Sequence, residues 1–259
     1  MPEQFLDVGP DRLWYDDSGG EGIPFVLLHP GITDSRVWDR MLPHLGPTRV
    51  IRFDRRGFGR SPRASEPYRA LDDLISLLDA LGLEQVHLVG NSMGGETSLA
   101  LAIAEAGRVA SMTLLCPGIG GYPWPEEEDN DPDLEARWIA AKEAGDLPGL
   151  ASVQLEYWCA SGTDEYLEEV VLRATELDHS EAAGLEQENP PQWELAAHLR
   201  VPTTVIAAEL DPPESMQASI DLAERIPEAV LVQLPVDHLP QYRDPAAVAE
   251  VVLATVARG

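Results

Sequence analysis

The sequence contains a single lysine, Lys142, and few basic residues of any kind. Its 18 Lys and Arg stand against 45 Asp and Glu, which gives a formal net charge of −27. Schiff-base chemistry would have to use that one lysine, which lies in an acidic helical stretch, so a lysine-dependent enzyme is not expected. The negative charge also argues against nucleic acid or an anionic membrane surface as a partner, because like charges repel.

Cysteines and long apolar runs are scarce as well. Cys116 and Cys159 are the only cysteines, and we expect both to be reduced, buried thiols. The chain shows no Cys or His spacing typical of a metal site, so neither a metal nor another cofactor is expected. No signal peptide and no run long enough to span a bilayer is apparent. These absences predict a cytoplasmic protein, and they carry no indication of its oligomeric state.

What the chain does contain is a regular alternation of strand and helix patterns. With 259 residues, 44% of them apolar, it is large enough for one α/β domain with an insertion. The alternation predicts a mostly parallel, twisted sheet covered by helices on both faces. The expected strands are 12–18, 24–29, 49–53, 86–90, 110–116, 203–208 and 229–234.

The alternation stops between residues 118 and 198, where no convincing strand pattern occurs. We therefore predict a helical cap over 118–198, inserted between two sheet strands of a core formed by 1–117 and 199–259. Helices are expected around 132–144, 147–160, 163–177 and 192–199. The acidic run 126–131 is expected to be a solvated loop.

A strand, a tight turn and a helix meet around Ser92. The turn reads Gly90-x-Ser92-x-Gly94, and an apolar helical run follows it at 97–104. This order is typical of a nucleophile elbow, in which a side chain at either glycine would strike the neighbouring strand or helix. The helix that begins there places a positive dipole end and free N–H groups where an oxyanion would form.

Candidate partners for Ser92 follow two later strands. Asp211 comes just after the strand 203–208, and His238 just after the strand 229–234. A serine hydroxyl needs a base and the base needs an orienting acid, and the order Ser, Asp, His is the one expected of a nucleophile-elbow hydrolase. Glu209 is the second choice for the acid, and Asp237 ranks below both.

These motifs together resemble the α/β-hydrolase family, specifically its small capped members. The resemblance rests on Leu28-His29-Pro30-Gly31, Asp54 to Ser61, Gly90 to Gly95, Glu209-Leu210-Asp211 and Asp237-His238-Leu239-Pro240. It implies a catalytic triad of Ser92, His238 and Asp211. It also implies an oxyanion hole made by the backbone N–H groups of Gly31 and Met93, with Ile32 as the fallback, because Pro30 has no N–H.

The predicted cap holds four of the six tryptophans of the chain. An aromatic wall over the site would bind substrate, so the candidate substrate-binding residues are Trp124, Trp138, Trp158 and Trp193. Ordinary helix packing is the alternative explanation, and we expect it to hold for at least two of them. Because the assigned catalytic residues lie outside the cap, the cap is expected to set substrate choice without taking part in the chemistry.

The leading functional prediction is a serine hydrolase of small carboxylic esters or lactones. A nucleophilic Ser argues against haloalkane dehalogenases and epoxide hydrolases, whose relatives carry Asp at this position. Three alternatives stay open: a carbon–carbon bond hydrolase of ring-cleavage products, a cofactor-free peroxidase, and a non-enzymatic ligand receptor on the same scaffold. The sequence Gly90 to Gly95 resembles the first alternative closely, but the chain lacks the extra Gly-Pro-Gly segment usual in its oxyanion loop.

Overall fold

The computed structural model describes residues 4–125 and 131–259. Most of the acidic run expected to be a solvated loop, residues 126–130, lies outside these ranges. Among the described residues, no helix is long and apolar enough to cross a membrane.

The described strands form an eight-stranded sheet with the order β1-β2-β4-β3-β6-β7-β9-β10. Neighbouring strands from β4 to β10 run parallel, whereas β1 and β2 pair antiparallel at one edge. The predicted mostly parallel sheet is confirmed, and β1 is an addition that the sequence pattern did not indicate. The strand bounds are β1 (Gln4–Val8), β2 (Asp11–Asp17), β3 (Phe25–Leu28), β4 (Val50–Phe53), β6 (Val86–Asn91), β7 (Val109–Leu115), β9 (Thr203–Ala208) and β10 (Val230–Leu234).

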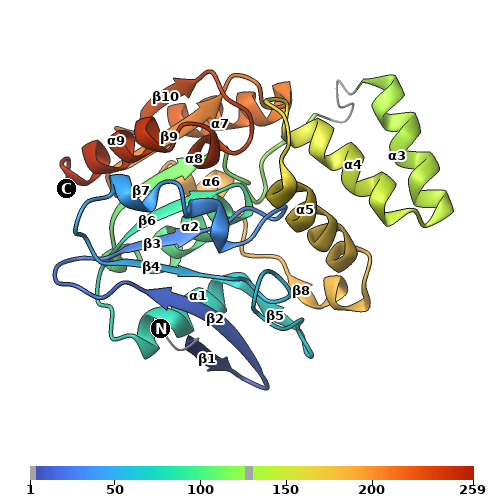
Figure 1. Cartoon of the computed structure of the whole chain (residues 1–259). Helices are drawn as coiled ribbons and strands as arrows, with labels where there is room; N and C mark the ends of the chain where they lie inside the picture. The colour runs from blue at the N-terminus through green and yellow to red at the C-terminus, as the bar shows by residue number, and fades with distance from the viewer. Residues whose placement is uncertain (1–3, 126–130) are drawn as a thin grey trace.

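Helices cover both faces of the sheet, as Figure 1 shows. One face packs against α1 (Ala70–Ala80), α2 (Met93–Ala104) and α7 (Pro213–Arg225). The other packs against α9 (Pro245–Val256) and a short 3₁₀ turn, Ser35–Trp38. Successive strand residues point to opposite faces, so Leu88 and Val89 of β6 enter different cores. Burial on both sides explains why the central strands are continuously apolar.

We call the segment 118–198 the inserted segment. In the part of it that the structure describes, four helices lie between β7 and β9. They are α3 (Pro132–Ala144), α4 (Leu147–Trp158), α5 (Glu165–Asp178) and the four-residue α6 (Trp193–Ala196). In Figure 1, α3, α4 and α5 stand together at one side of the sheet, with α3 farthest out. None of the residues of α3 is buried.

The absence of a strand from the inserted segment was a wrong prediction. β8 (Glu186–Gln187) pairs in parallel with β5 (Tyr68–Arg69), far away in the sequence. A two-residue strand is too short to produce a periodic pattern, so the sequence carried no signal for it. The helix expected over 192–199 is likewise shorter than predicted, because only Trp193–Ala196 is helical.

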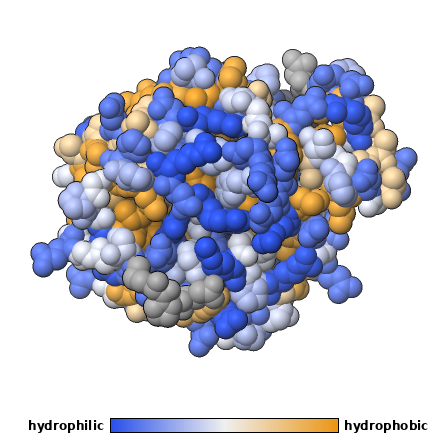
Figure 2. All heavy atoms as spheres, in the orientation of Figure 1, coloured by the Kyte–Doolittle hydropathy of each residue, from blue (hydrophilic) through white to orange (hydrophobic). Residues whose placement is uncertain are grey.

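Polar residues dominate the face drawn in Figure 2, where hydrophobic residues occur in separate groups. This agrees with the large excess of acidic side chains in the sequence.

Candidate active site

Ser92 lies at the sharp turn between β6 and α2. Its φ of 53° and ψ of −118° are sterically costly for a residue with a side chain. Gly90 and Gly94 make the turn possible: a Cβ on Gly90 would collide with the carbonyl oxygen of Gly94, and one on Gly94 with that of Leu28. The strained turn holds Ser92 at the first helical turn of α2, as the glycine pattern predicted.

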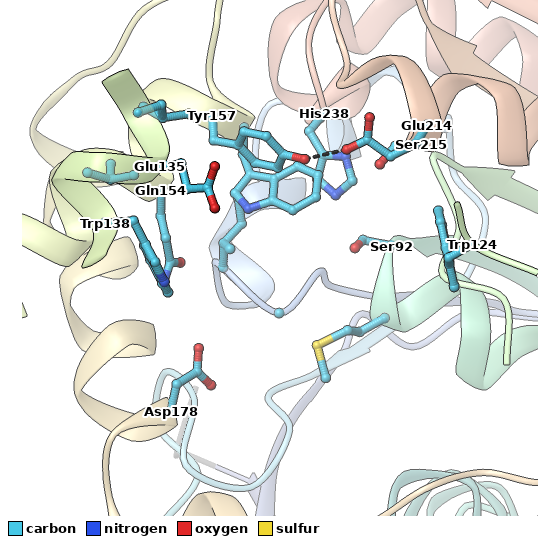
Figure 3. Close-up of a pocket in the computed structure, with 16 residues that line it drawn as sticks. Ser92, Trp124, Glu135, Trp138, Gln154, Tyr157, Asp178, Glu214, Ser215 and His238 are labelled. Carbon is cyan, nitrogen blue, oxygen red and sulfur yellow. Dashed lines mark hydrogen bonds between the residues drawn. The ribbon is translucent and has the colours of Figure 1, made fainter. Parts of the chain in front are cut away.

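His238 and Asp211 form a buried acid–base pair. The Nδ1 of His238 lies 2.8 and 3.0 Å from the two carboxylate oxygens of Asp211, and the two residues are 3% and 6% exposed. Because the carboxylate only accepts, Nδ1–H donates, which leaves Nε2 free to take a proton. In Figure 3, the His238 ring and the Ser92 side chain face the same space.

The two other acids considered for this role lie elsewhere. Glu209 is exposed. Asp237 is buried, but its carboxylate receives Arg243 Nε at 3.0 Å and the backbone N–H of Ser161 at 2.9 Å. Asp237 therefore ties α8 (Pro240–Arg243) to the inserted segment and makes no contact with the His238 ring that resembles that of Asp211.

A buried amide that the sequence analysis did not single out holds the histidine loop in place. Asn91, the residue before the nucleophile, donates from Nδ2 to the carbonyl oxygens of Leu115 and His238 at 2.9 and 3.1 Å. Its Oδ1 accepts from Gln241 at 2.9 Å. The backbone carrying His238 is thus attached directly to the strand that carries Ser92.

Cys116 supports the acid. Its thiol, the Asp211 carboxylate and the His238 ring lie within 4.8 Å of one another. Burial, together with the charge of Asp211 and the hydrogen bond to it, raises the pKa of the Cys116 thiol well above its usual value. The thiol therefore stays protonated and donates to Asp211. These three groups fit a metal poorly, because a metal needs the thiolate and Nδ1 is already occupied by Asp211.

The predicted oxyanion residues, Gly31 and Met93, both line the pocket. Gly31 lies so close to Met93 that an added Cβ would collide with its sulfur. The Met93 N–H is at the first position of α2, where no intrahelical acceptor exists. Beneath this loop, His29 donates from Nδ1 to the Pro30 carbonyl and accepts the Arg55 N–H at Nε2. Burial lowers the pKa of His29, so the ring is neutral and its role is structural.

A cavity of about 680 Å³ opens above Ser92 (Figure 3). The core contributes Ser92, His238, Glu214 and Ser215 to its lining. The inserted segment contributes Leu134, Glu135, Trp138, Val153, Gln154, Tyr157, Trp158 and Asp178.

The four candidate tryptophans separate into three situations. Trp124 and Trp138 line the cavity. Trp158 also lines it, and its ring lies against His238 at a centroid distance of 4.3 Å. Trp193 is outside the lining: it stacks edge-on against Tyr122 and under Arg225. The substrate-binding prediction for Trp193 is therefore corrected, because packing against α7 holds its ring away from the cavity.

The acidic residues of the lining were missed by the sequence analysis. Glu135, Asp178 and Glu214 bring three carboxylates into the cavity, and none of its described lining residues is Arg or Lys. Tyr157 donates its hydroxyl to Glu214. Asp178 is exposed, yet partial desolvation by the pocket wall raises the pKa of its carboxyl overall, although the nearby His179 acts in the opposite direction. Acidic residues are common throughout this chain, so nothing in the sequence marked these three.

Arg55 connects the core to the inserted segment. It is 6% exposed and pairs with Glu186 of β8, which also accepts from the Tyr68 hydroxyl at 3.0 Å. Asp54 braces the turn after β4 by accepting hydrogen bonds from the N–H groups of Ser35 and Arg60.

Comparisons with known proteins agree with this geometry. A family model described as the alpha/beta hydrolase fold matches residues 24–245. The 2-hydroxymuconate semialdehyde hydrolase of Pseudomonas sp. (strain CF600) is 40% identical over 127 residues, which cover 46% of this chain and 43% of that protein. The match spans less than half the length of the curated relatives.

Two solved structures resemble nearly the whole chain. One is Est816, described as an N-acyl homoserine lactone degrading enzyme, with a TM-score of 0.76, 26% identity and coverage of 97% of this chain and 99% of that one. The other is a thermophilic esterase from Thermogutta terrifontis, with a TM-score of 0.77, 26% identity and coverage of 100% and 99%.

Proposed function

Because the chain belongs to the alpha/beta hydrolase fold family, we propose that it is a serine hydrolase of small carboxylic esters or lactones. The observation that carries the proposal is the placement of Ser92 at a strained turn facing the same cavity as His238, whose Nδ1 is fixed by Asp211. This arrangement suits acyl transfer through a covalent intermediate.

In the proposed reaction, Ser92 Oγ attacks the carbonyl carbon while His238 Nε2 accepts the hydroxyl proton. The Gly31 and Met93 N–H groups stabilise the negative oxygen of the tetrahedral intermediate. His238 then returns the proton to the leaving alcohol, and water releases the acyl group from Ser92 by the same steps. Asp211 holds the Nδ1–H tautomer throughout and stabilises the imidazolium.

We propose that the inserted segment, 118–198, is the cap that sets substrate choice. Its support is the lining of the cavity, to which α3 and α4 contribute apolar and aromatic side chains and α5 contributes Asp178. The cap was expected to take no part in the chemistry. The contact between Trp158 and His238 revises this expectation, because one residue of the inserted segment packs against the proposed catalytic base.

Carbon–carbon bond hydrolysis is the second candidate, favoured by the 40% identity to the hydroxymuconate semialdehyde hydrolase. A hydroxymuconate derivative carries a carboxylate. The cavity opposes such a substrate with three carboxylates and, among its described lining residues, no Arg or Lys. Like charges in a concave site raise the energy of an anionic ligand, so the charge of the pocket favours the ester or lactone function.

The test compares turnover of p-nitrophenyl acetate and butyrate, a neutral γ-lactone and a ring-cleavage dienoate by the same preparation. We expect ester or lactone turnover, and labelling of Ser92 by a fluorophosphonate located by mass spectrometry. Faster cleavage of the dienoate would favour the second candidate. Stoichiometric labelling without turnover of any of these would favour a receptor.

A further inference from the structure

The wall of the cavity opposite Ser92 is acidic and aromatic. In Figure 3, Trp138, Glu135 and Asp178 lie across the cavity from Ser92, and both carboxylates point into it. They come from different helices: Glu135 and Trp138 from α3, and Asp178 from the end of α5.

The negative charge of Asp178 lies at a position where it does not stabilise the fold. It is the last residue of α5, where the helix dipole disfavours a negative charge. Its side chain is exposed, but partial desolvation by the pocket wall raises the pKa of its carboxyl, which also disfavours the charged form. A carboxylate kept where both effects oppose it is more easily explained by what it meets in the cavity than by the fold.

The two arginines near this wall are already paired with carboxylates. Arg55, whose charge reaches Asp178, pairs with Glu186. On α3, Arg137 pairs with Asp133 and Glu156. The carboxylates of the wall therefore project negative potential into the cavity, and a low-dielectric concave surface focuses it.

We propose that Glu135 and Asp178 set the charge selectivity of the pocket, so that it prefers esters carrying a positively charged group remote from the scissile bond. This rests on the proposed ester hydrolysis. The group is an ammonium or guanidinium, attracted by the two carboxylates and by the indole face of Trp138. An anionic group at the same place meets two like charges.

The test uses three p-nitrophenyl esters whose acyl chains end in trimethylammonium, tert-butyl or carboxylate, at several chain lengths. The first two groups have the same shape and differ only in charge. Values of kcat/KM are divided by each ester's rate of hydrolysis by hydroxide, which removes intrinsic reactivity. At the best chain length we expect the cation to exceed the neutral ester by about tenfold, and the anion to be the poorest.

The double variant Glu135→Gln/Asp178→Asn should bring the ratio of cationic to neutral kcat/KM close to one. The matched control is Glu143→Gln/Glu176→Gln, which removes the same charge from exposed positions of α3 and α5 outside the lining. The control should keep the parent's preference. An unchanged preference in the first double variant, or none in the parent, overturns the proposal.

Binding measured without turnover separates this proposal from the proposed reaction. Choline and its neutral isostere 3,3-dimethylbutan-1-ol are titrated by calorimetry into the parent and both double variants. We expect choline to bind at least about tenfold more tightly than the alcohol, with the difference lost only in Glu135→Gln/Asp178→Asn. Choline preference without ester turnover would refute the reaction and keep the subsite. Ester turnover with no charge preference in either assay would support the proposed reaction and refute the cationic subsite.

Discussion

The two walls of the cavity are built in different ways. The core wall presents Ser92 and His238 from turns fixed by buried hydrogen bonds and close glycine contacts. The opposite wall presents Glu135 and Trp138 from α3, which buries none of its residues. The difference indicates that bond cleavage needs atoms held within narrow limits, whereas recognition of a charged group acts over a longer range and tolerates a looser support.

The largest effect should come from the core wall. Ser92→Ala removes the nucleophile, and the smaller side chain adds no strain to the turn. We expect kcat on a neutral ester to fall by about 10⁴-fold or more. Ser215→Ala, at another serine of the same cavity, is the control and should keep kcat within a few fold. If folded Ser92→Ala protein hydrolysed the ester at nearly the parent's rate, Ser92 would not be the nucleophile, and the core wall would not be the catalytic one.

The core wall was predictable because its chemistry is tied to local sequence patterns. Ser92 follows a strand and is framed by glycines that no other residue could replace, and Asp211 and His238 follow strands at the same sheet edge. The opposite wall has no such pattern: Glu135 and Asp178 are two among 45 acidic residues. Their meeting depends on how α3, α4 and α5 pack together, which helical periodicity does not specify.

The same reasoning explains the mixed outcome for the tryptophans. Composition shows that the inserted segment is rich in Trp, but the direction of each ring depends on tertiary contacts. The Trp158 ring packs against His238, whereas the Trp193 ring packs against Tyr122 and Arg225. Asn91 was missed because a lone Asn at the end of a strand has no signature, although its amide joins segments that are distant in the sequence.

The second-largest effect should be that of Asp211→Asn, which keeps the shape but favours the wrong tautomer of His238. We expect a loss of about 10⁴-fold in kcat. The kcat of Glu209→Gln should stay close to that of the parent. Asp237→Asn should lower the free energy of unfolding by about 1–3 kcal/mol through the weakened Arg243 pair, with little effect on kcat of the folded fraction. A severe kcat defect in Glu209→Gln or Asp237→Asn would mean that the acid has been wrongly assigned.

Trp158→Ala should have an intermediate effect, because the indole packs on the catalytic ring as well as lining the cavity. We expect about a tenfold loss of kcat/KM on every ester, short or long, from poorer positioning of His238. Trp124→Ala and Trp138→Ala should instead change the order of preferred substrates. Trp193→Ala, outside the lining, should leave that order unchanged. If the loss of kcat/KM in Trp158→Ala differed between short and long esters, Trp158 would contribute to substrate binding and not to the positioning of His238.

The smallest effect expected is that of Cys116→Ala. Losing one hydrogen bond to Asp211 is worth about 1 kcal/mol, so kcat should fall about fivefold. Cys116→Ser keeps an O–H donor and should restore part of the rate, with both measured on the same neutral ester. Equal rates in the parent and in Cys116→Ala would show that the Asp211 carboxylate does not depend on the thiol.

Helix α3 owes its form to its own sequence. Asp131 caps its first turn, Pro132 begins it, Arg137 pairs with Asp133 one turn apart, and Gly145 ends it in the left-handed conformation. Local signals of this kind stabilise a helix by only small amounts, so α3 can unfold without disrupting the core. Its amide hydrogens should therefore exchange with solvent faster than those of α4 and α5. The opening and closing of α3 would then control how quickly product leaves the cavity.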